Sequence, residues 1–234
     1  MALPRIDTPT YQVQIPSTGD TIHFRPFLVK EQKILMMAQE SNQDQQSVDA
    51  VSKLVSACTF DKFDVINAPT FDVEYLFLQI RSKSVGESVD VNLICPDDDK
   101  TTVLTKINLS DIKIEFSDDH SNSLQITDTI RMVCKYPTLH DILRVGKLGE
   151  TESIFKLLYR CIVEIHYGDE IYHRVDISDK DIEEFIDQLT GEQFDRVVKF
   201  FETMPRLKHR VMVTNPKTKV ESEVILEGLQ NFLG

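Results

Sequence analysis

The stretch GDTIHFRPFL, residues 19–28, decides the fold, because DTIRMVCKYPTL at residues 128–139 repeats its plan. Each is a short alternating, strand-like run that leads through Pro and Leu into a helical stretch. Three more pairs follow in the same order: FDVEYLFL (71–78) with FDRVVKFF (194–201), VNLICP (91–96) with VMVTNP (211–216), and INLSDI (107–112) with VILEGL (224–229). This order indicates an internal duplication with a period of about 115 residues. The alternative is chance agreement among short apolar strings.

The first copy predicts a hairpin followed by helices and a second hairpin. Tyr11, Val13 and Ile15 alternate with polar residues, and residues 16–20 have the composition of a turn. Pro26 ends the strand, because it lacks an N–H donor, and its fixed φ suits a helix start. We expect helices over residues 29–40, 46–58 and 70–86, and strands over 89–94, 102–109 and 112–116.

The polar segment at residues 117–123 marks the boundary between the copies. Beyond it we expect an extended stretch at 124–134, a hairpin around Gly168, helices at 139–148, 154–165, 178–189 and 190–203, and strands at 210–214 and 221–226. The sequence therefore predicts an α+β fold of two pseudo-repeated lobes, residues 1–117 and 118–234, each with helices packed on small antiparallel β-hairpins.

The amino-acid composition limits which classes of protein this chain can belong to. Of the 234 residues, 41% are hydrophobic and 27% are charged, as in a soluble globular protein. The formal net charge of -12 argues against nucleic-acid binding and favours basic protein partners, although acidity that only keeps the protein dispersed fits equally well. Apolar runs are too short for a membrane span, and no secretion signal is expected.

Candidate metal ligands are few. The four cysteines lie in apolar contexts and predict buried, reduced thiols. Cys95 precedes a proline as in a zinc knuckle, but the second ligand position holds Asp98, and the equivalent positions of the second copy hold Asn215 and Thr218. We therefore expect two metal-free hairpin turns and no cofactor.

One pair of histidines leaves a metal site open as an alternative. His166 and His173 flank the hairpin around Gly168, with Glu164, Asp169 and Glu170 nearby in the sequence. Polar residues beside an exposed turn also serve solvation alone. The sequence contains no nucleophile elbow, zinc-protease, Walker A or dinucleotide-binding motif, so we expect no enzyme.

Several motifs carry a resemblance to a known family. They are Leu3-Pro4, residues 8–11 (TPTY), residues 16–19 (PSTG), residues 25–31 (RPFLVKE), and residues 81–87 (RSKSVGE) followed by Cys95-Pro96. With these motifs the chain resembles the baseplate hub assembly proteins of T-even-type contractile-tail bacteriophages. It departs from those relatives that have a fuller cysteine knuckle after Cys95-Pro96, which argues against an inherited metal site.

The resemblance implies a non-enzymatic protein that assembles the central hub of the tail baseplate through contacts with other hub proteins, alone or as an oligomer. It would be assembled in the host cytoplasm and located in the virion baseplate. The alternatives are a transient assembly chaperone that is absent from the mature virion, and a metal-binding module. The residues expected to be critical for the interface or the fold are Arg25, Pro26, Phe27, Lys30, Arg81, Lys83, Gly86, Glu87 and, in an apolar C-terminus that either docks on a partner or folds back, Phe232.

Overall fold

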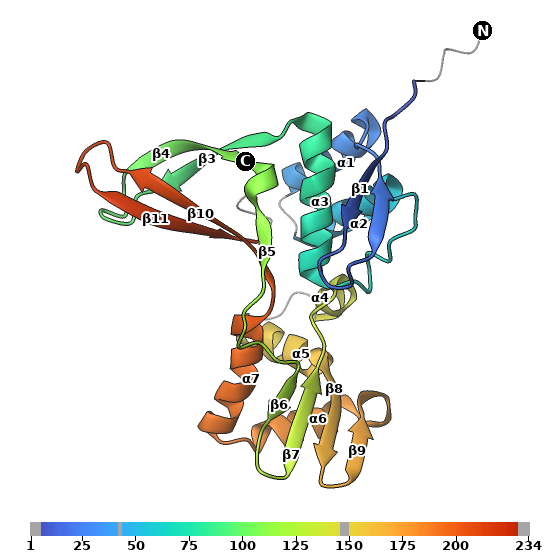
Figure 1. Cartoon of the computed structure of the whole chain (residues 1–234). Helices are drawn as coiled ribbons and strands as arrows, with labels where there is room; N and C mark the ends of the chain where they lie inside the picture. Colours follow the sequence, from blue (N-terminus) through green and yellow to red (C-terminus); the bar gives the residue numbers. More distant parts are fainter. Residues whose placement is uncertain (1–5, 42–43, 146–149, 229–234) are drawn as a thin grey trace. The chain divides into compact units, whose positions relative to one another are not determined.

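The structure is a computed structural model that describes residues 6–41, 44–145 and 150–228 (Figure 1). Within these residues it contains seven α-helices and eleven β-strands, and the strands form small antiparallel sheets. The predicted α+β class is therefore confirmed. Residues 1–115 and 206–234 belong to one compact unit, unit 1, and residues 116–205 belong to a second, unit 2.

Unit 1 opens with the hairpin of β1 (Tyr11–Gln14) and β2 (Thr21–Phe24), where the alternating pattern predicts it. Val13 and Phe24 are buried, while Gln12 and Gln14 are exposed, as the two-residue period of a strand requires. The connecting turn contains Gly19 at φ +76°, a left-handed conformation that glycine adopts without strain.

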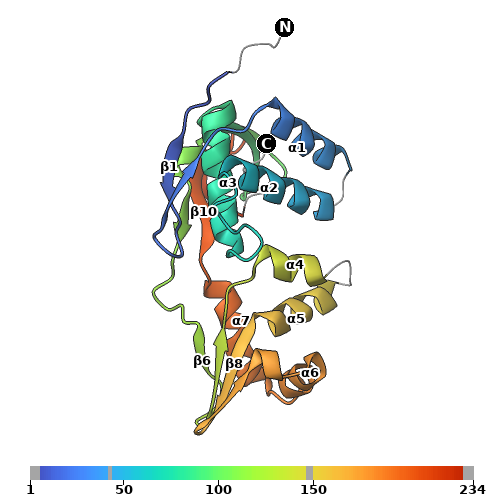
Figure 2. The same ribbon diagram turned by 90° about the vertical axis from the view of Figure 1, so that its right-hand side faces the viewer.

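Three helices follow in unit 1: α1 (Val29–Ser41), α2 (Asp44–Cys58) and α3 (Thr70–Val85). Helix α2 packs against both α1 and α3 (Figure 2). Helix α3 is deeply buried, because its Leu76, Phe77 and Ile80 side chains are at most 1% exposed. It begins directly after Pro69 and ends at Gly86.

Two hairpins that lie far apart in the sequence complete unit 1. They are β3 (Ser88–Ile94) with β4 (Thr102–Asn108), and β10 (Arg206–Thr214) with β11 (Glu221–Glu227). Strand β5 (Lys113–Glu115), which follows the 3₁₀ turn η1 (Leu109–Asp111), pairs with the start of β10. Leu93, Ile107, Leu207, Val213 and Leu226 of these elements are buried in one core.

Unit 2 is a four-stranded antiparallel sheet covered by helices. Its strand order is β6 (Ser123–Gln125), β7 (Ile130–Cys134), β8 (Ile162–Tyr167) and β9 (Glu170–His173). The helices are α4 (Leu139–Val145), α5 (Glu150–Cys161), α6 (Asp179–Asp187) and α7 (Gly191–Thr203), and the 3₁₀ turn η2 (Arg174–Asp176) precedes α6. Met132 and Ile165 of the sheet share a core with Leu158, Ile182 and Phe200 of the helices.

One predicted helix was wrong in its last third. The apolar spacing predicted a helix over residues 154–165, but α5 ends at Cys161 and β8 begins at Ile162. The β-branched Ile162 and Ile165 are buried in the sheet core, and β8 pairs with β7 along its length. A short apolar run fits a helix face or a strand equally well, and pairing with β7 decides for the strand.

The two halves of the chain contain matching elements in the same order. The first half contains two strands, three helices and a hairpin, in the order β1, β2, α1, α2, α3 and β3–β4. The second half contains the same kinds of element in the order β6, β7, α4, α5, α7 and β10–β11. In the second half β8, β9 and α6 are inserted before α7. The compact units divide the chain differently from the predicted lobes 1–117 and 118–234, because β10 pairs with β5 and its hairpin lies in unit 1. The duplication itself stays a prediction.

Candidate protein-binding site

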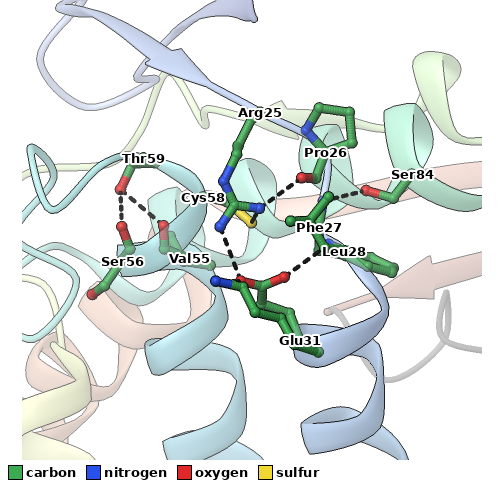
Figure 3. A network of polar contacts seen from close by, with 11 residues as sticks. Arg25, Pro26, Phe27, Leu28, Glu31, Val55, Ser56, Cys58, Thr59 and Ser84 are labelled. Carbon is green, nitrogen blue, oxygen red and sulfur yellow. Dashed lines mark hydrogen bonds and ion pairs between the residues drawn. The ribbon is translucent and has the colours of Figure 1, made fainter. Parts of the chain in front are cut away.

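The segment after β2 is anchored to helix α2. The backbone N–H of Arg25 donates to the carbonyl of Cys58 at 2.9 Å, at the C-terminal end of α2. Nη1 of the Arg25 guanidinium also donates a hydrogen bond to the carbonyl of the next residue, Pro26, at 2.9 Å (Figure 3). The chain direction after the strand is thereby fixed by Pro26 and by contacts to a distant helix.

An ion pair joins this segment to the start of α1. Arg25 Nη2 lies 2.9 Å from Glu31 Oε1, and the two side chains are 12% and 3% exposed (Figure 3). The other oxygen, Oε2, accepts the backbone N–H of Leu28 at 2.8 Å, one of the donors that a helix start leaves without an intrahelical partner. Burial opposes ionisation of Glu31, but the hydrogen bonds from Arg25 and Leu28 outweigh it and lower its pKa.

Phe27 connects the same segment to α3. Its backbone N–H donates to Ser84 Oγ at 2.9 Å, and the Ser84 hydroxyl donates to the carbonyl of Ile80 at 2.6 Å (Figure 3). The two motifs singled out in the sequence, residues 25–31 and 81–87, therefore lie side by side although they are more than 50 residues apart.

A cavity of about 220 Å³ lies where these motifs meet. Its walls include Phe27, Met36 of α1, and Arg81 and Val85 of α3. Met36 and Val85 are 54% and 53% exposed, so the cavity opens onto an apolar surface. Burial lowers the pKa of Arg81, but an arginine remains protonated at neutral pH. The site therefore combines one positive charge with apolar walls.

The other predicted residues that the structure describes do not line the cavity. Lys83 Nζ lies 2.6 Å from Glu87 Oε1 in an exposed i,i+4 pair, and 5.7 Å from the centroid of the Tyr11 ring. Gly86 adopts φ +125°, and the Glu87 carbonyl accepts the N–H of Leu109 at 2.8 Å. Lys30 is 69% exposed and 3.4 Å from Glu31, and Phe232 lies outside the described residues.

Sequence reasoning did not single out Glu31, Ser84 or Met36, although the motifs at residues 25–31 and 81–87 include the first two. Glu31 resembled any polar residue on the solvent face of α1, although a Glu at the third helical position is a known signal of a capped helix start. The positions of Ser84 and Met36 depend on how α1 and α3 pack on α2, which no local sequence pattern predicts.

Unit 2 repeats the anchoring of Arg25 and Glu31. The backbone N–H of Lys135 donates to the carbonyl of Cys161 at 2.8 Å, and Lys135 Nζ lies 2.6 Å from Asp141 Oδ2. Asp141 is 3% exposed and accepts the N–H of Thr138 at 3.1 Å. Burial opposes ionisation of Asp141, but the bonds from Lys135 and Thr138 lower its pKa. As around Arg25, the anchored residue directly follows a strand, and its acidic partner lies six residues later in the sequence. In both units the helix that accepts the backbone N–H ends at a cysteine.

The chain as a whole matches one protein family. The family described as T4 bacteriophage base plate protein matches residues 8–234. This chain belongs to that family. No curated protein and no solved structure matches it. The baseplate protein therefore has a structural role in a phage tail baseplate, where other baseplate proteins are its partners.

The two proline turns of this baseplate protein meet at their tips. The N–H of Cys95 donates to Thr101, and that of Asn215 donates to Val220, at 2.8 and 2.9 Å. Asn215 Nδ2 donates across to Asp97 Oδ1 at 3.0 Å, and Thr218 also donates to Asp97. Of the four positions considered as metal ligands, Asn215 and Thr218 thus take part in a hydrogen-bonded contact between the hairpins. All four cysteines are buried and free of disulfides.

The histidine pair of the baseplate protein lies on one face of β8 and β9. His166 Nε2 is 2.8 Å and His173 Nδ1 is 3.3 Å from the carboxylate of Glu164. Within residues 6–41, 44–145 and 150–228, no group of three His, Cys, Asp or Glu side chains is arranged to hold a metal ion. In the same ranges, no helix has the length and apolar character needed to cross a membrane.

Proposed function

We propose that this baseplate protein acts in the central hub of the tail, where it holds other hub proteins through its surface and catalyses no reaction. The observation that carries the proposal is the family match over residues 8–234, because it extends over both compact units. The motifs at residues 25–31 and 81–87 favour the hub branch of the family. Assembly in the host cytoplasm and a final place in the virion baseplate are parts of the same proposal.

The surface around Phe27 is the contact that we propose for a hub partner. Met36 and Val85 of the cavity wall are 54% and 53% exposed, and Arg81 lines the same cavity. Methionine, aromatic residues and arginine are enriched at protein interfaces, where their long side chains adapt to a partner. Exposed apolar side chains that share one cavity mark an interaction site more often than an isolated exposed residue does.

The residues predicted from the sequence divide into two roles under this proposal. Phe27 and Arg81 contact the partner, and Lys30 and Lys83 lie at the exposed rim. Arg25, Pro26, Gly86 and Glu87 hold the backbone that presents them. Because Arg25 and Glu31 fix the entry to α1, the surface is formed before binding, which reduces the entropy lost on association.

The duplication into lobes 1–117 and 118–234 remains part of the proposal. It is supported by the matching element order and by the shared arrangement of Arg25 with Glu31 and of Lys135 with Asp141. Two related lobes would give the hub protein two related contact surfaces.

The test is co-elution of the purified chain with purified hub proteins in size-exclusion chromatography. We expect a stable complex with the wild-type chain and its loss with Met36→Asp. The matched control is Met212→Asp on β10, where the methionine is 57% exposed and lies away from the cavity lining. A wild-type chain that elutes alone with every hub protein contradicts the proposal, and equal loss with both variants contradicts the assigned surface.

A transient assembly chaperone would use the same surface and differ only in its fate. Quantitative mass spectrometry of mature virions separates the two roles. We expect stoichiometric amounts of the chain in the virion. A chain that co-elutes with hub proteins but is absent from the virion would instead have the chaperone role.

A further inference from the structure

Unit 2 contains a larger cavity that has no part in the surface around Phe27. It has a volume of about 350 Å³ and lies between the sheet and α6. The sheet contributes Ile130, Tyr167 and Tyr172, and α6 with the residue before its cap contributes Phe185 and Ile177. Every lining residue except Asp181 is aliphatic or aromatic. We name this space the β9–α6 cavity.

Apolar surface continues from the cavity to the outside of unit 2. Tyr167 and Tyr172 are 55% and 44% exposed at its rim, and Val175 of η2 is 91% exposed. Concave apolar sites with a few polar groups at the edge are where proteins take up ligand or partner side chains. An apolar side chain of a partner placed in the cavity would bury this apolar surface away from water, which stabilises the complex.

The strand beside the cavity has an open edge. Strand β9 is the last of its sheet, and among the described residues no strand pairs with its outer edge. An edge strand offers backbone N–H and C=O groups to an added strand. Side chains alternate along β9, so Tyr172 lies over the cavity beside Ile165, whereas Ile171 lies on the opposite face beside His166. An extended segment added to β9 would point every second side chain toward the cavity.

The surroundings of the cavity are strongly acidic. Residues 169–187 contain eight acidic and two basic residues, and all eight acidic residues are exposed. Both basic side chains already lie against carboxylates of the segment, Arg174 against Asp179 and Lys180 against Glu184. Hydrogen bonds from Ser178 lower the pKa of Asp181, so the carboxylate in the cavity wall is ionised at neutral pH. A partner that docks here must therefore be basic.

The geometry points to the β9–α6 cavity as a docking site for an extended basic segment of a partner protein, which adds to the β9 edge and places one apolar side chain in the cavity. Lysine or arginine side chains two residues before and two residues after the anchor lie on the same face as the anchor, where they can reach the carboxylates of residues 169–187. The inference rests on the proposed function only in naming the partner as another protein of the hub.

The test uses fluorescent peptides and the full chain, so it does not depend on any hub protein. In the probe peptides Thr and Lys alternate, with Thr directly beside one central Leu, Phe or Trp and Lys two residues from it on either side. In the first control peptide the central residue is Ser, and in the second every Lys is replaced by Glu. Fluorescence anisotropy then measures the affinity of each peptide at low and at moderate salt.

We expect at least one apolar-centred basic peptide to bind about tenfold more tightly than the Ser peptide, and the Glu peptide not to bind. Binding should weaken as salt screens the carboxylates. Equal binding of the Leu, Phe, Trp and Ser peptides would show attraction of charge alone and would overturn the inference. Absence of binding by all basic peptides would overturn it too.

Variants of β9 locate the site. Tyr172→Ala should weaken the best peptide about tenfold, because it removes an aromatic wall, whereas Tyr172→Phe should keep the affinity. The matched control Ile171→Ala removes an apolar side chain that is 51% exposed on the opposite face and should leave the affinity unchanged. Thermal unfolding confirms that each variant is folded. An equal effect of the Tyr172 and Ile171 substitutions to Ala would place the peptide elsewhere and refute the assignment.

Failure of this test and failure of the proposed function are distinguishable. A chain that co-elutes with hub proteins but binds no basic peptide keeps the hub role and loses the β9–α6 site. A chain that binds the peptides through Tyr172 but co-elutes with no hub protein keeps the site and loses the hub role.

Discussion

Replacing Glu31 by Gln should lower the free energy of unfolding of unit 1 by about 3 kcal/mol at neutral pH. The amide of Gln retains an acceptor for the N–H of Leu28, so the main loss is the charge that faces Arg25. The guanidinium is only 12% exposed and cannot recover full hydration after the substitution. Removing one member of a buried ion pair costs about 3–5 kcal/mol, and the low end applies because Arg25 also donates to the carbonyl of Pro26.

A control variant separates this pair from its exposed neighbour. Lys30 also lies near Glu31, at 3.4 Å, but its side chain is 69% exposed. Solvent screens such a contact, so Lys30→Gln should change the free energy of unfolding by no more than about 0.5 kcal/mol.

The effect of Glu31→Gln should depend on pH in one direction. Because the pKa of Glu31 is lowered in the folded chain, its carboxylate stabilises the fold fully above its ordinary value of 4.5. This stabilisation is lost as the pH falls through the lower folded pKa. The difference between wild type and variant should therefore be largest at neutral pH and should shrink below pH 4.5.

Thiol labelling along a urea gradient measures the two units separately. Cys58, which contacts Arg25, reports unit 1, and Cys161 reports unit 2, and both are fully buried in the folded chain. Burial raises the pKa of Cys58 to about 11, which further protects it from reaction until it is exposed by unfolding. A dithiodipyridine reagent, which reacts with thiols at acidic pH, and peptide-level mass spectrometry give each transition.

We expect Glu31→Gln to shift the Cys58 transition and to leave that of Cys161 in place. Asp141→Asn, the equivalent change in unit 2, should do the reverse. A Cys58 shift below about 1 kcal/mol, or one that grows as the pH falls, would refute the claim that a buried ion pair fixes the start of α1.

Three further predictions concern backbone and turn positions. Gly86→Ala should destabilise unit 1 by about 1–3 kcal/mol in urea unfolding, through backbone strain at φ +125° and without a clash, because no atom lies within 4 Å of the added Cβ; an unchanged midpoint would contradict this. Ser178→Ala removes one half of the capping box of α6 and should speed hydrogen exchange of that helix, with a loss of about 1 kcal/mol, whereas unchanged exchange would argue against the cap. Asn215→Ala removes the contact with Asp97 between hairpin tips and should cost about 1–3 kcal/mol, and stability equal to that of wild type would show that the tips are held in another way.

Local patterns of the sequence predicted most of the elements of unit 1. The alternation of Tyr11, Val13 and Ile15 with a turn at residues 16–20 gave the first hairpin, and the apolar stripe of α3 gave that helix. Each of these signals lies within a few residues of the element that it specifies. The helix predicted over residues 154–165 failed because Ile162 and Ile165 pair with β7, which lies some 30 residues earlier.

The local sequence patterns could not predict which distant segments pair with each other. Strand β10 joins β5 across about 90 residues, and this places the last hairpin in unit 1. The proximity of Phe27 to Arg81 likewise depends on the hydrogen bond to Ser84. The motifs pointed to these residues, but the cavity that they line comes from helix packing. The β9–α6 cavity had no signal except the acidic composition of residues 169–187.

The most direct test of the central claim is a cryo-electron microscopy reconstruction of hub precursors isolated from infected cells, with peptide mass spectrometry of the same sample. The account predicts density for both units at the centre of the baseplate, with the surface around Phe27 against a neighbouring protein. Hub precursors that contain neither density nor peptides of this chain would contradict it.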